Sequence, residues 1–583
     1  MILQALTQYY ETLLEKGAIS PPGWDDQFSV SLGLELAPDG TLIQLIPFKE
    51  TVQRGKKEVE VPRTMRVPAH VKRSSGVAAN FLCDTSSYML GADAKGKPQR
   101  ALECFAANRA LHQQILADAD TPAAHAILSF FAAWDPAAAA AHPLLAPYWK
   151  EITTGANLIF CMDLEPVTSD EAICRAWQAY YSSADDNAPT AQCLVTGRTA
   201  PIAVLHPSIK GVTGAQSMGA SLVSFNAPAF ESYGQSQGMN APVSEYAAFA
   251  YTTALNALLS DREHRRTIGD TTVVCWAQSG QSAYQGFGME ALFGDTQSQV
   301  RGMLEQLSRG ERCDWQGCLL DPAEHFYLLG LSPNAARLSV RFFLQDTFGG
   351  FAENLNRHYE DIAVVRPAYE TFETLPVWRL LDETVNQNSR NKEASPQLAG
   401  ELLRAILLDL PYPATLLNGV QLRIRADREV SWGRAAIIKG YYHRLWRKGR
   451  STDTMPKEDI LQMELSENYN NTAYTLGRLF SLYEQIQEAA NPGINATIKD
   501  KYFTSAACTP GIIFPQLGNL AQKHLRVIRR TKAGLAVNFE KRLGELMSLV
   551  GETFPVRQDL HQQGSFQLGY YFENQARYLK KEQ

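Results

Sequence analysis

Cysteine is scarce in this sequence and is not arranged in pairs. There are nine cysteines among 583 residues, none forms a C-x-x-C motif, and Cys313 and Cys318 are the two closest together. Zinc sites and the disulfide frameworks of small secreted proteins both depend on characteristic cysteine spacings. The spacing therefore argues against both and favours buried free thiols in a reducing compartment.

Long apolar runs are missing too. The most apolar segment, residues 124–149, is interrupted by Asp135, Pro136, His142 and Pro143, so it is too broken to cross a bilayer. The first residues lack the basic segment and apolar core of a signal peptide. We expect a cytoplasmic protein that makes no membrane contact.

An excess of positive charge is also absent, because 55 Lys and Arg stand against 61 Asp and Glu for a formal net charge of −6. A protein that binds nucleic acid on its own is usually basic overall. Either this chain does not bind nucleic acid, or its cations are gathered on part of the surface. The clusters described below favour the second interpretation.

Motifs for nucleotide, metal and acyl-transfer chemistry are not found. Gly91 to Pro98 reads GADAKGKP, but a phosphate-binding loop needs Ser or Thr where Pro98 stands. There is no G-x-G-x-x-G, H-E-x-x-H or G-x-S-x-G, and the eleven histidines are dispersed. We therefore expect no catalytic residue, cofactor or metal, although one sequence leaves open a site assembled from distant residues.

The strongest cluster of positive charge lies within residues 421–450. Nine basic residues face only Asp427 and Glu429, and four aromatic residues are interleaved with them. Cations mixed with aromatics are typical of surfaces that follow a single nucleic-acid strand, and the alternative is a solvated helix face with aromatics packed inward. The predicted backbone-binding residues of this segment are Arg423, Arg425, Arg428, Arg434, Lys439, Arg444, Arg447 and Lys448.

A second basic cluster follows at helical spacing. Its members are Lys523, Arg526, Arg529 and Arg530. This spacing predicts one basic helix face, which is either a phosphate-binding surface or an ordinary solvated face.

Residues 71–109 combine cations with small residues that let a backbone approach a polyanion. A plain surface loop before a helix is the alternative. The candidate nucleic-acid contacts are Lys72, Arg73, Ser74, Ser75 and Asn80, followed by the candidate backbone-binding residues Lys95, Lys97 and Arg100.

The glycine-rich run after residue 209 offers polar side chains that can hydrogen-bond base edges. Lys210, Thr213 and Gln216 are candidate nucleic-acid contacts, with a tight turn beside the core as the alternative. Asn240, in a second shaped loop, is predicted as another polar reader.

The expected fold has two parts, since 583 residues exceed what one core supports. Helical spacing covers residues 2–16, and hairpins are predicted around the turns at 38–40 and 332–334. This pattern gives a mixed α+β region over residues 1–385, with antiparallel hairpins. The polar segment 386–397 is predicted as a linker, and residues 398–583 as an all-α helical bundle.

Several of these segments resemble one protein family. Residues 71–109, the N-terminal MILQALTQYYETLLEKGAISPPG, the middle segment beginning IKGVTGAQSMGASLVSFN and the C-terminal LGRLFSLYEQIQEAANPGINATIKDKYF are similar to the large subunit of the type I-C CRISPR–Cas surveillance complex. This family is also called the Dvulg-subtype CRISPR-associated protein.

The resemblance implies a non-catalytic subunit that acts in antiviral defence. Its partners would be a CRISPR RNA-containing complex with backbone and handle-binding subunits, target double-stranded DNA, the displaced strand and a helicase-nuclease. The subunit would recognise the motif flanking the target, promote unwinding and hold the non-target strand. It also implies that residues 463–583 are made separately, from Met463, as a small subunit.

Two other functions stay open from the residues alone. One is a metal-dependent nuclease or RNA-processing enzyme that acts by itself. The other is a scaffold that contacts only proteins.

Overall fold

The computed structural model of the protein describes residues 2–54, 57–71, 73, 76–92, 96–182, 188–261, 264–294, 297–390, 392, 394–467 and 471–579. The chain divides into two units. The smaller unit comprises Tyr10–Val204 and Ser232–Ala250, and the larger unit comprises Met1–Tyr9, Leu205–Glu231 and Tyr251–Gln583. Helices α1 (Ile2–Glu15) and α7 (Glu245–Ser260) contribute residues to both units.

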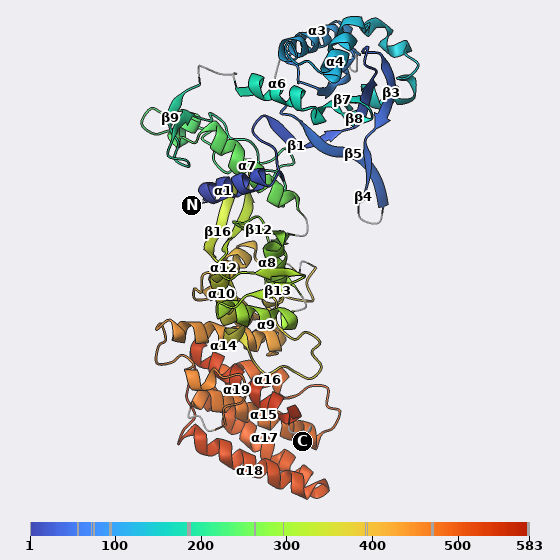
Figure 1. Ribbon diagram of the computed structural model, residues 1–583. Coiled ribbons are helices and arrows are strands. Elements are labelled where there is room, and N and C mark those ends of the chain that lie inside the picture. Colours follow the sequence, from blue (N-terminus) through green and yellow to red (C-terminus); the bar gives the residue numbers. More distant parts are fainter. Residues whose placement is uncertain are drawn as a thin grey trace. The chain divides into compact units, whose positions relative to one another are not determined.

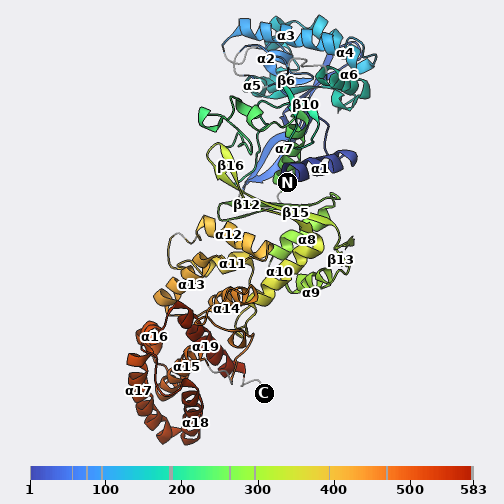
Figure 2. The same ribbon diagram turned by 90° about the vertical axis from the view of Figure 1, so that its left-hand side faces the viewer.

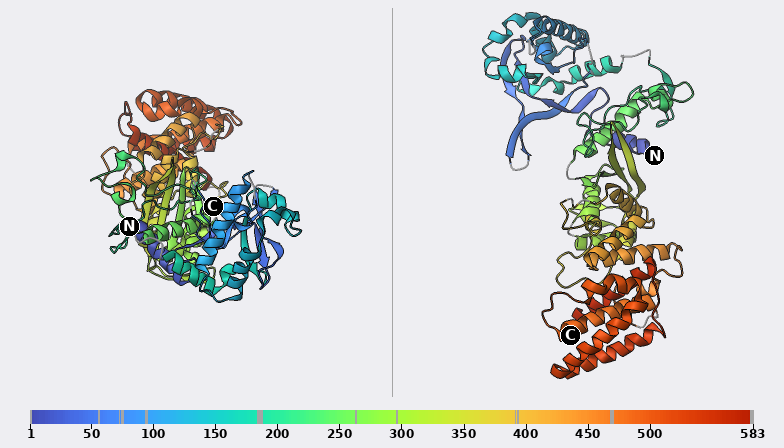
Figure 3. Two further views of the ribbon diagram at one scale, coloured as in Figure 1. Left: turned by 90° about the horizontal axis from the view of Figure 1, so that it is seen from above. Right: turned by 180° about the vertical axis from the view of Figure 1, so that it is seen from behind.

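The smaller unit contains two main sheets (Figure 1). In the first, β5 (Lys57–Pro68) pairs antiparallel with both β1 (Trp24–Val30) and β4 (Lys49–Arg54), and the β4–β5 ribbon extends well beyond the helices of this unit (Figure 3). The second sheet has the strand order β3-β2-β7-β6. Its strands are β3 (Leu42–Pro47), β2 (Leu32–Leu36), β7 (Asn157–Met162) and β6 (Cys83–Thr85), with β8 (Glu165–Pro166) on β7.

Short helices and a hairpin complete the smaller unit. Its core gathers aromatic side chains from two helices around the sheet, including Phe131, Phe160 and Trp177. The helices are α2 (Ser86–Met89), α3 (Pro98–Ile115), α4 (Pro122–Ala133), α5 (Trp149–Thr153) and α6 (Glu171–Ser182), and the hairpin pairs β9 (Thr190–Gln192) with β10 (Thr199–Pro201).

The larger unit begins with a four-stranded antiparallel sheet in the order β11-β12-β15-β16. The hairpin predicted around 332–334 is present at its edge, but Ser332, Pro333 and Asn334 are paired strand residues and the chain turns at Ala335 and Ala336. The strands are β11 (Arg265–Ile268), β12 (Thr271–Ala277), β15 (His325–Asn334) and β16 (Arg337–Thr347), and β13 (Cys313–Trp315) pairs separately with β14 (Cys318–Leu320).

Helices make up the rest of the larger unit (Figure 2). Three helices accompany the sheet: α8 (Ser282–Phe293), α9 (Gln297–Ser308) and α10 (Phe348–Ile362). Those that follow are α11 (Val377–Asp382), α12 (Pro396–Leu407), α13 (Ala414–Asp427), α14 (Trp432–Arg447), α15 (Thr472–Ala490), α16 (Ile498–Cys508), α17 (Pro510–Thr531), α18 (Ala533–Val550) and α19 (Leu560–Leu579).

Two glycines let α15 and α19 approach backbone to backbone. A Cβ atom added at Gly477 would lie 1.9 Å from the Phe566 carbonyl oxygen, and one at Gly569 would lie 2.0 Å from that of Tyr474. Either distance is far inside van der Waals contact, so the helix pair requires glycine at both positions. This close crossing lies at the centre of the C-terminal helices.

The predicted fold class is confirmed. Antiparallel hairpins dominate the N-terminal region and the C-terminal region is helical. The structure departs from the prediction at β2 and β7, which pair in parallel. In addition, none of the described helices is both long and apolar enough to cross a membrane.

The chain divides elsewhere than at the predicted linker, residues 386–397. One hydrophobic core runs from Ile268 through the helices on both sides of that segment to Phe572. The reason is that α11 and α12, which flank the segment, each bury an apolar face in this core. The described residues of this segment, 386–390, 392 and 394–397, are mostly exposed, and both flanking helices belong to the same unit.

Candidate nucleic-acid interface

The first predicted stretch folds around a buried carboxylate, Asp84. Arg73 forms a two-point ion pair with it, one N···O distance being 2.9 Å, and stacks 3.9 Å from the centre of the Tyr88 ring. Asn80 is 4% exposed, and its Oδ1 accepts the Val71 backbone N–H at 2.9 Å. Sequence analysis assigned Arg73 and Asn80 to DNA contacts, but here they stabilise the loop, because a buried carboxylate requires partners.

The neighbouring cations lie at the start of α3. Lys97 and Arg100 are both exposed, and the Arg100 guanidinium donates to the Gly76 carbonyl oxygen at 2.7 Å. The predicted contacts Lys72, Ser74, Ser75 and Lys95 lie outside the described residues.

The glycine-rich run forms a closed loop, which we call loop 209–220. Ile209 and Ala220 bridge its base with two backbone hydrogen bonds of 2.9 Å. Thr213 ties it to the β-sheet, since its N–H donates to the Thr272 hydroxyl at 3.0 Å and its own hydroxyl lies 2.8 Å from that of Thr267. Thr213 was predicted as a DNA contact, but both of its polar groups are used to hold the loop.

The tip of loop 209–220 is presented to solvent. Gln216 and Ser217 are exposed, and Met218 is 82% exposed. Lys210 is exposed at the base, where its backbone N–H donates to Asn256 and leaves the ammonium group outside. The loop therefore combines a fixed backbone with free polar side chains, which is the arrangement that reading base edges requires.

Asn240 differs from its predicted role. Its Oδ1 accepts the Ser232 N–H at 2.8 Å, and its Nδ2 donates to the Gln235 and Gln237 carbonyl oxygens, each at 3.0 Å. Its amide is saturated by its own loop, and it therefore shapes the loop rather than offering hydrogen bonds to a base.

The most basic helix, α14, turns several cations inward. Arg434 is 6% exposed, Lys439 4% and Arg444 0%. The Arg444 Nε lies 2.6 Å from the Asp361 Oδ2, and the Lys439 Nζ donates to the Glu360 carbonyl oxygen at 2.8 Å. Burial lowers the pKa of Lys439 to about 8. These three residues were predicted to bind nucleic acid, and the structure corrects this, because a side chain buried in the core cannot meet a phosphate.

Other cations of the cluster are neutralised at the surface by carboxylates. Arg447 binds Asp409 through two N···O contacts of 2.6 and 2.7 Å, and Lys448 lies 2.6 Å from the same carboxylate. Burial alone would raise the pKa of Asp409, but these hydrogen bonds lower it well below its usual range. Arg423 is likewise paired with Asp427.

Arg425, Arg428 and Arg450 of the first cluster stay exposed, with no carboxylate partner among the described residues. Arg425 donates to the Gln563 side chain at 3.1 Å, and Arg428 follows α13 in the left-handed conformation. The interleaved aromatics are not all available either, since Trp432 and Tyr442 are buried. The first cluster is therefore mainly a structural network.

The second cluster behaves as its spacing predicts. Lys523, Arg526 and Arg530 are exposed along one side of α17. Among the described residues none of the three has a carboxylate partner, whereas Arg529 is paired with Glu540 of α18. We call Lys523, Arg526 and Arg530 the α17 basic face. It presents three uncompensated positive charges at the spacing of helical turns.

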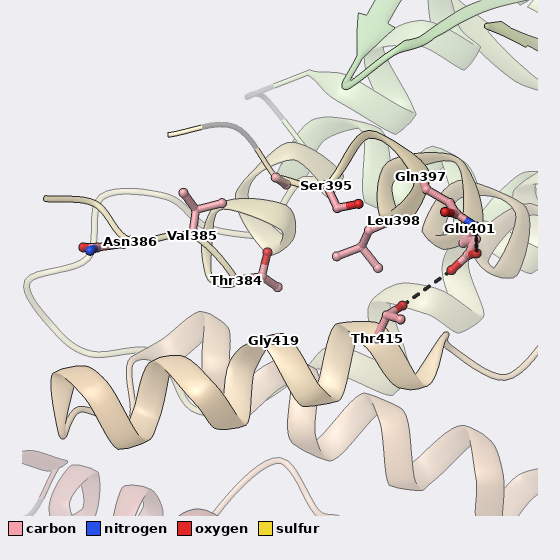
Figure 4. A pocket seen from close by; sticks show the side chains of 10 residues that line it. Thr384, Val385, Asn386, Ser395, Gln397, Leu398, Glu401, Thr415 and Gly419 are labelled. Atoms are coloured by element: carbon pink, nitrogen blue, oxygen red, sulfur yellow. Dashed lines mark hydrogen bonds between the residues drawn. The ribbon is translucent and has the colours of Figure 1, made fainter. Parts of the chain in front are cut away.

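A pocket of about 460 Å³ lies at the start of α12 and α13 (Figure 4). Glu401 is the one titratable group among the described residues that line it, and it accepts from Gln397 at 3.1 Å and from Thr415 at 3.5 Å. The other described lining residues are uncharged and include the hydroxyl side chains of Thr384, Ser395 and Thr415. Within the described part of the chain, no three His, Cys, Asp or Glu side chains gather in a way that could hold a metal ion.

Comparison with known proteins identifies the family of this chain. A search of curated proteins returned no match. A family model described as "CRISPR-associated protein (Cas_Csd1)" matches residues 6–578, which is nearly the whole chain. The match spans both units, as well as loop 209–220 and the α17 basic face. The chain therefore belongs to the Csd1 family of CRISPR-associated proteins, as its sequence segments predict.

Proposed function

We propose that this protein is the large subunit of a CRISPR RNA-guided DNA surveillance complex. The guide RNA reads the target by base pairing, and the protein recognises a short motif in the flanking duplex and promotes unwinding. It does not cleave DNA itself, and a recruited helicase-nuclease does so. Family membership supports the assignment to a CRISPR system.

The observation that carries the proposal is loop 209–220. Its base is closed by two 2.9 Å backbone hydrogen bonds, while Gln216 and Ser217 are exposed at its tip and Lys210 at its base. An amide and a hydroxyl can hydrogen-bond base edges, and the ammonium group of Lys210 can bind an adjacent phosphate. In this proposal the loop contacts the flanking duplex.

The α17 basic face is the surface proposed to hold the displaced strand. Lys523, Arg526 and Arg530 have no described carboxylate partners, so their charges are available to phosphates. Phosphate contacts of this kind bind a strand without regard to its sequence. We assign the displaced non-target strand to this surface.

The test uses the assembled guide-loaded complex with a Lys210→Ala/Gln216→Ala/Ser217→Ala variant. We expect normal assembly, normal binding to a pre-opened target, and binding to the closed duplex weakened about 10- to 100-fold, the loss expected for one or two base contacts. Arg309→Ala is the matched control, because this exposed arginine faces Glu305 at 3.8 Å. Equal affinity of variant and wild type for the closed duplex would remove the reading role from this loop.

The competing functions give different results in the same preparation. A nuclease acting alone would cut DNA or RNA when the purified chain is supplied with divalent metal. A scaffold would lose assembly when its contact surfaces are changed, but would show no dependence of DNA affinity on loop 209–220 or on the α17 basic face.

A further inference from the structure

The loop held by Asn240 presents one side chain entirely to solvent. Tyr233 is 101% exposed. It occupies the first central position of a turn closed by the Gln235 N–H and the Ser232 carbonyl oxygen, at 3.0 Å. Both central residues have positive φ, 54° at Tyr233 and 71° at Gly234. This segment precedes α7 (Figure 1).

Tyrosine is a poor residue for this position. A bulky side chain is disfavoured at positive φ, and turns with two such residues prefer Asn, Asp or Gly. The fold gains nothing in exchange, since the Tyr233 ring is fully exposed and buries no apolar area. A residue that strains its turn and contributes no packing has a function outside the fold of this chain.

Contacts within the loop fix the backbone on both sides of Tyr233. Asn240 bonds Ser232 on one side of the turn and Gln235 on the other, and so fixes both ends of the Tyr233–Gly234 pair. Gly238 anchors the loop at its base, where a Cβ atom would lie 2.1 Å from the Ala203 carbonyl oxygen. The Tyr233 backbone is therefore rigid although the ring is free.

We propose that Tyr233 is a stacking platform for a nucleobase carried by the complex. This inference rests on the proposed function. Every base has a flat face that can stack on an exposed aromatic ring. The loop side chains nearest the turn in sequence, Ser232, Gln235, Ser236 and Gln237, are uncharged and can form hydrogen bonds, and the charged Glu231 precedes them. They suit the edges of a base better than an apolar protein surface, where an anchoring Tyr is enclosed by packed neighbours.

The base could come from the guide RNA or from the target DNA, and two measurements separate these sources. The ratio of guide RNA to protein in the complex without DNA reports the first. Binding of target duplexes that carry 2-aminopurine at successive positions beside the guide-complementary segment reports the second, because stacking quenches the fluorescence of that base.

The variants are Tyr233→Asn, which suits the turn, and Tyr233→Phe, which keeps the ring. We expect Tyr233→Asn to leave the melting temperature of the isolated chain unchanged or higher. It should weaken the binding of either the guide RNA or the target duplex about 5- to 100-fold, which is the loss expected for one base–aromatic stack. Tyr233→Phe should behave like wild type in both.

Three results would overturn the proposal. The first is wild-type behaviour of Tyr233→Asn in both measurements. The second is a lowered melting temperature, which indicates a structural role. The third is failure of the folded variant to assemble with its protein partners, which indicates a protein contact. The Lys210→Ala/Gln216→Ala/Ser217→Ala variant tests the proposed function separately, so either idea can fail while the other stands.

Discussion

Arg444 on α14 donates from Nε to the Asp361 Oδ2 of α10 at 2.6 Å, and neither side chain is more than 2% exposed. Arg444 also donates to the carbonyl oxygens of Ala405 and Leu410, at 2.7 and 2.8 Å. Burial alone would raise the pKa of Asp361, but hydrogen bonds from His443 and Arg444 lower it below its usual value. The Arg444 side chain therefore links α14 to α10 and to the C-terminal end of α12.

Replacing Arg444 by Met should therefore destabilise the larger unit by about 3 kcal/mol, because the Asp361 carboxylate loses its fully buried partner and keeps only the partly exposed His443 and Arg447, at 2.7 and 3.2 Å. Urea denaturation followed by circular dichroism measures the change. Arg450→Met is the control, since Arg450 is exposed beyond the end of α14, and it should change stability by less than about 0.5 kcal/mol. Similar stability of the two variants would contradict the structural role of the pair.

The α17 basic face should contribute salt-dependent affinity. In the assembled complex, Lys523→Ala/Arg526→Ala/Arg530→Ala should weaken binding to single-stranded DNA at every sequence. It should also reduce the slope of log affinity against log salt by about 2, which is roughly 0.7 for each lost phosphate contact. Titrations at three or more salt concentrations measure this slope.

Arg529→Ala provides the matched control on the same helix, because the charge of Arg529 is already paired with Glu540. It should leave both the affinity and the slope nearly unchanged. An equal effect of Arg529→Ala and the triple variant would show that the binding depends on net charge and not on this face.

Buried histidines should make the protein sensitive to acid. Burial lowers the pKa of His358 to about 3 and that of His112 to about 4. Between those values and the ordinary value near 6.5 only the unfolded state binds the protons, so stability falls as the pH falls through this window. Each histidine should contribute a slope of about 1.4 kcal/mol per pH unit.

Replacing His358 by Gln should remove one of these contributions. We expect the stability of the larger unit to decline less steeply between pH 6 and pH 4, by about 1.4 kcal/mol per pH unit. Denaturation midpoints across that range measure the effect. An unchanged slope would mean that His358 is not buried as a neutral ring.

The α15–α19 crossing should not accept a methyl group. Gly477→Ala would place Cβ 1.9 Å from the Phe566 carbonyl oxygen, so the helices must separate at a cost of about 1–3 kcal/mol or more. Gly544→Ala on α18 is the matched control, since a Cβ there meets nothing within 4 Å. It should stabilise the protein by about 0.5–1 kcal/mol, because alanine is the better helix former. Opposite signs for the two variants, measured by thermal unfolding, would confirm the close approach.

Met463 offers a test of separate production of the C-terminal helices. If translation also begins there, mass spectrometry of the untagged complex should detect a product beginning at Met463, and Met463→Leu should remove it while leaving the full chain. Met463 is 55% exposed, so this substitution should not disturb the fold. Absence of the fragment from the wild-type complex would refute the hypothesis.

Much of the fold was predictable because its signals are local. The hairpin of β2 and β3 turns through Asp39 and Gly40, where the Thr41 N–H donates to the Asp39 carboxylate at 2.9 Å and Gly40 has φ 87°. The C-terminal helices follow apolar residues at helical spacing. Such patterns depend on near neighbours in the chain, so the sequence displays them directly.

The candidate site was only partly predictable, because exposure depends on partners far away in the chain. The exposed cations of α17 could be read from their spacing, but the pairing of Arg529 with Glu540 could not. Arg444 could not, because its partner Asp361 is 83 residues away and nothing in residues 421–450 shows which cations meet a buried carboxylate. Tyr233 was not predicted, because the sequence shows neither the exposure of its side chain nor its positive backbone φ.

Local patterns in the sequence were enough to predict the family, the helical and hairpin segments, and the stretches rich in positive charge. Tertiary structure alone decided which of those charges face solvent and which loop residues are presented rather than used for support. The physical reason is that a charged or amide side chain can bind a ligand only if the folded chain does not already provide its hydrogen-bond or ion-pair partner. Folding supplies one to Asn80, Asn240 and Arg444, while Gln216 and Lys523 stay exposed.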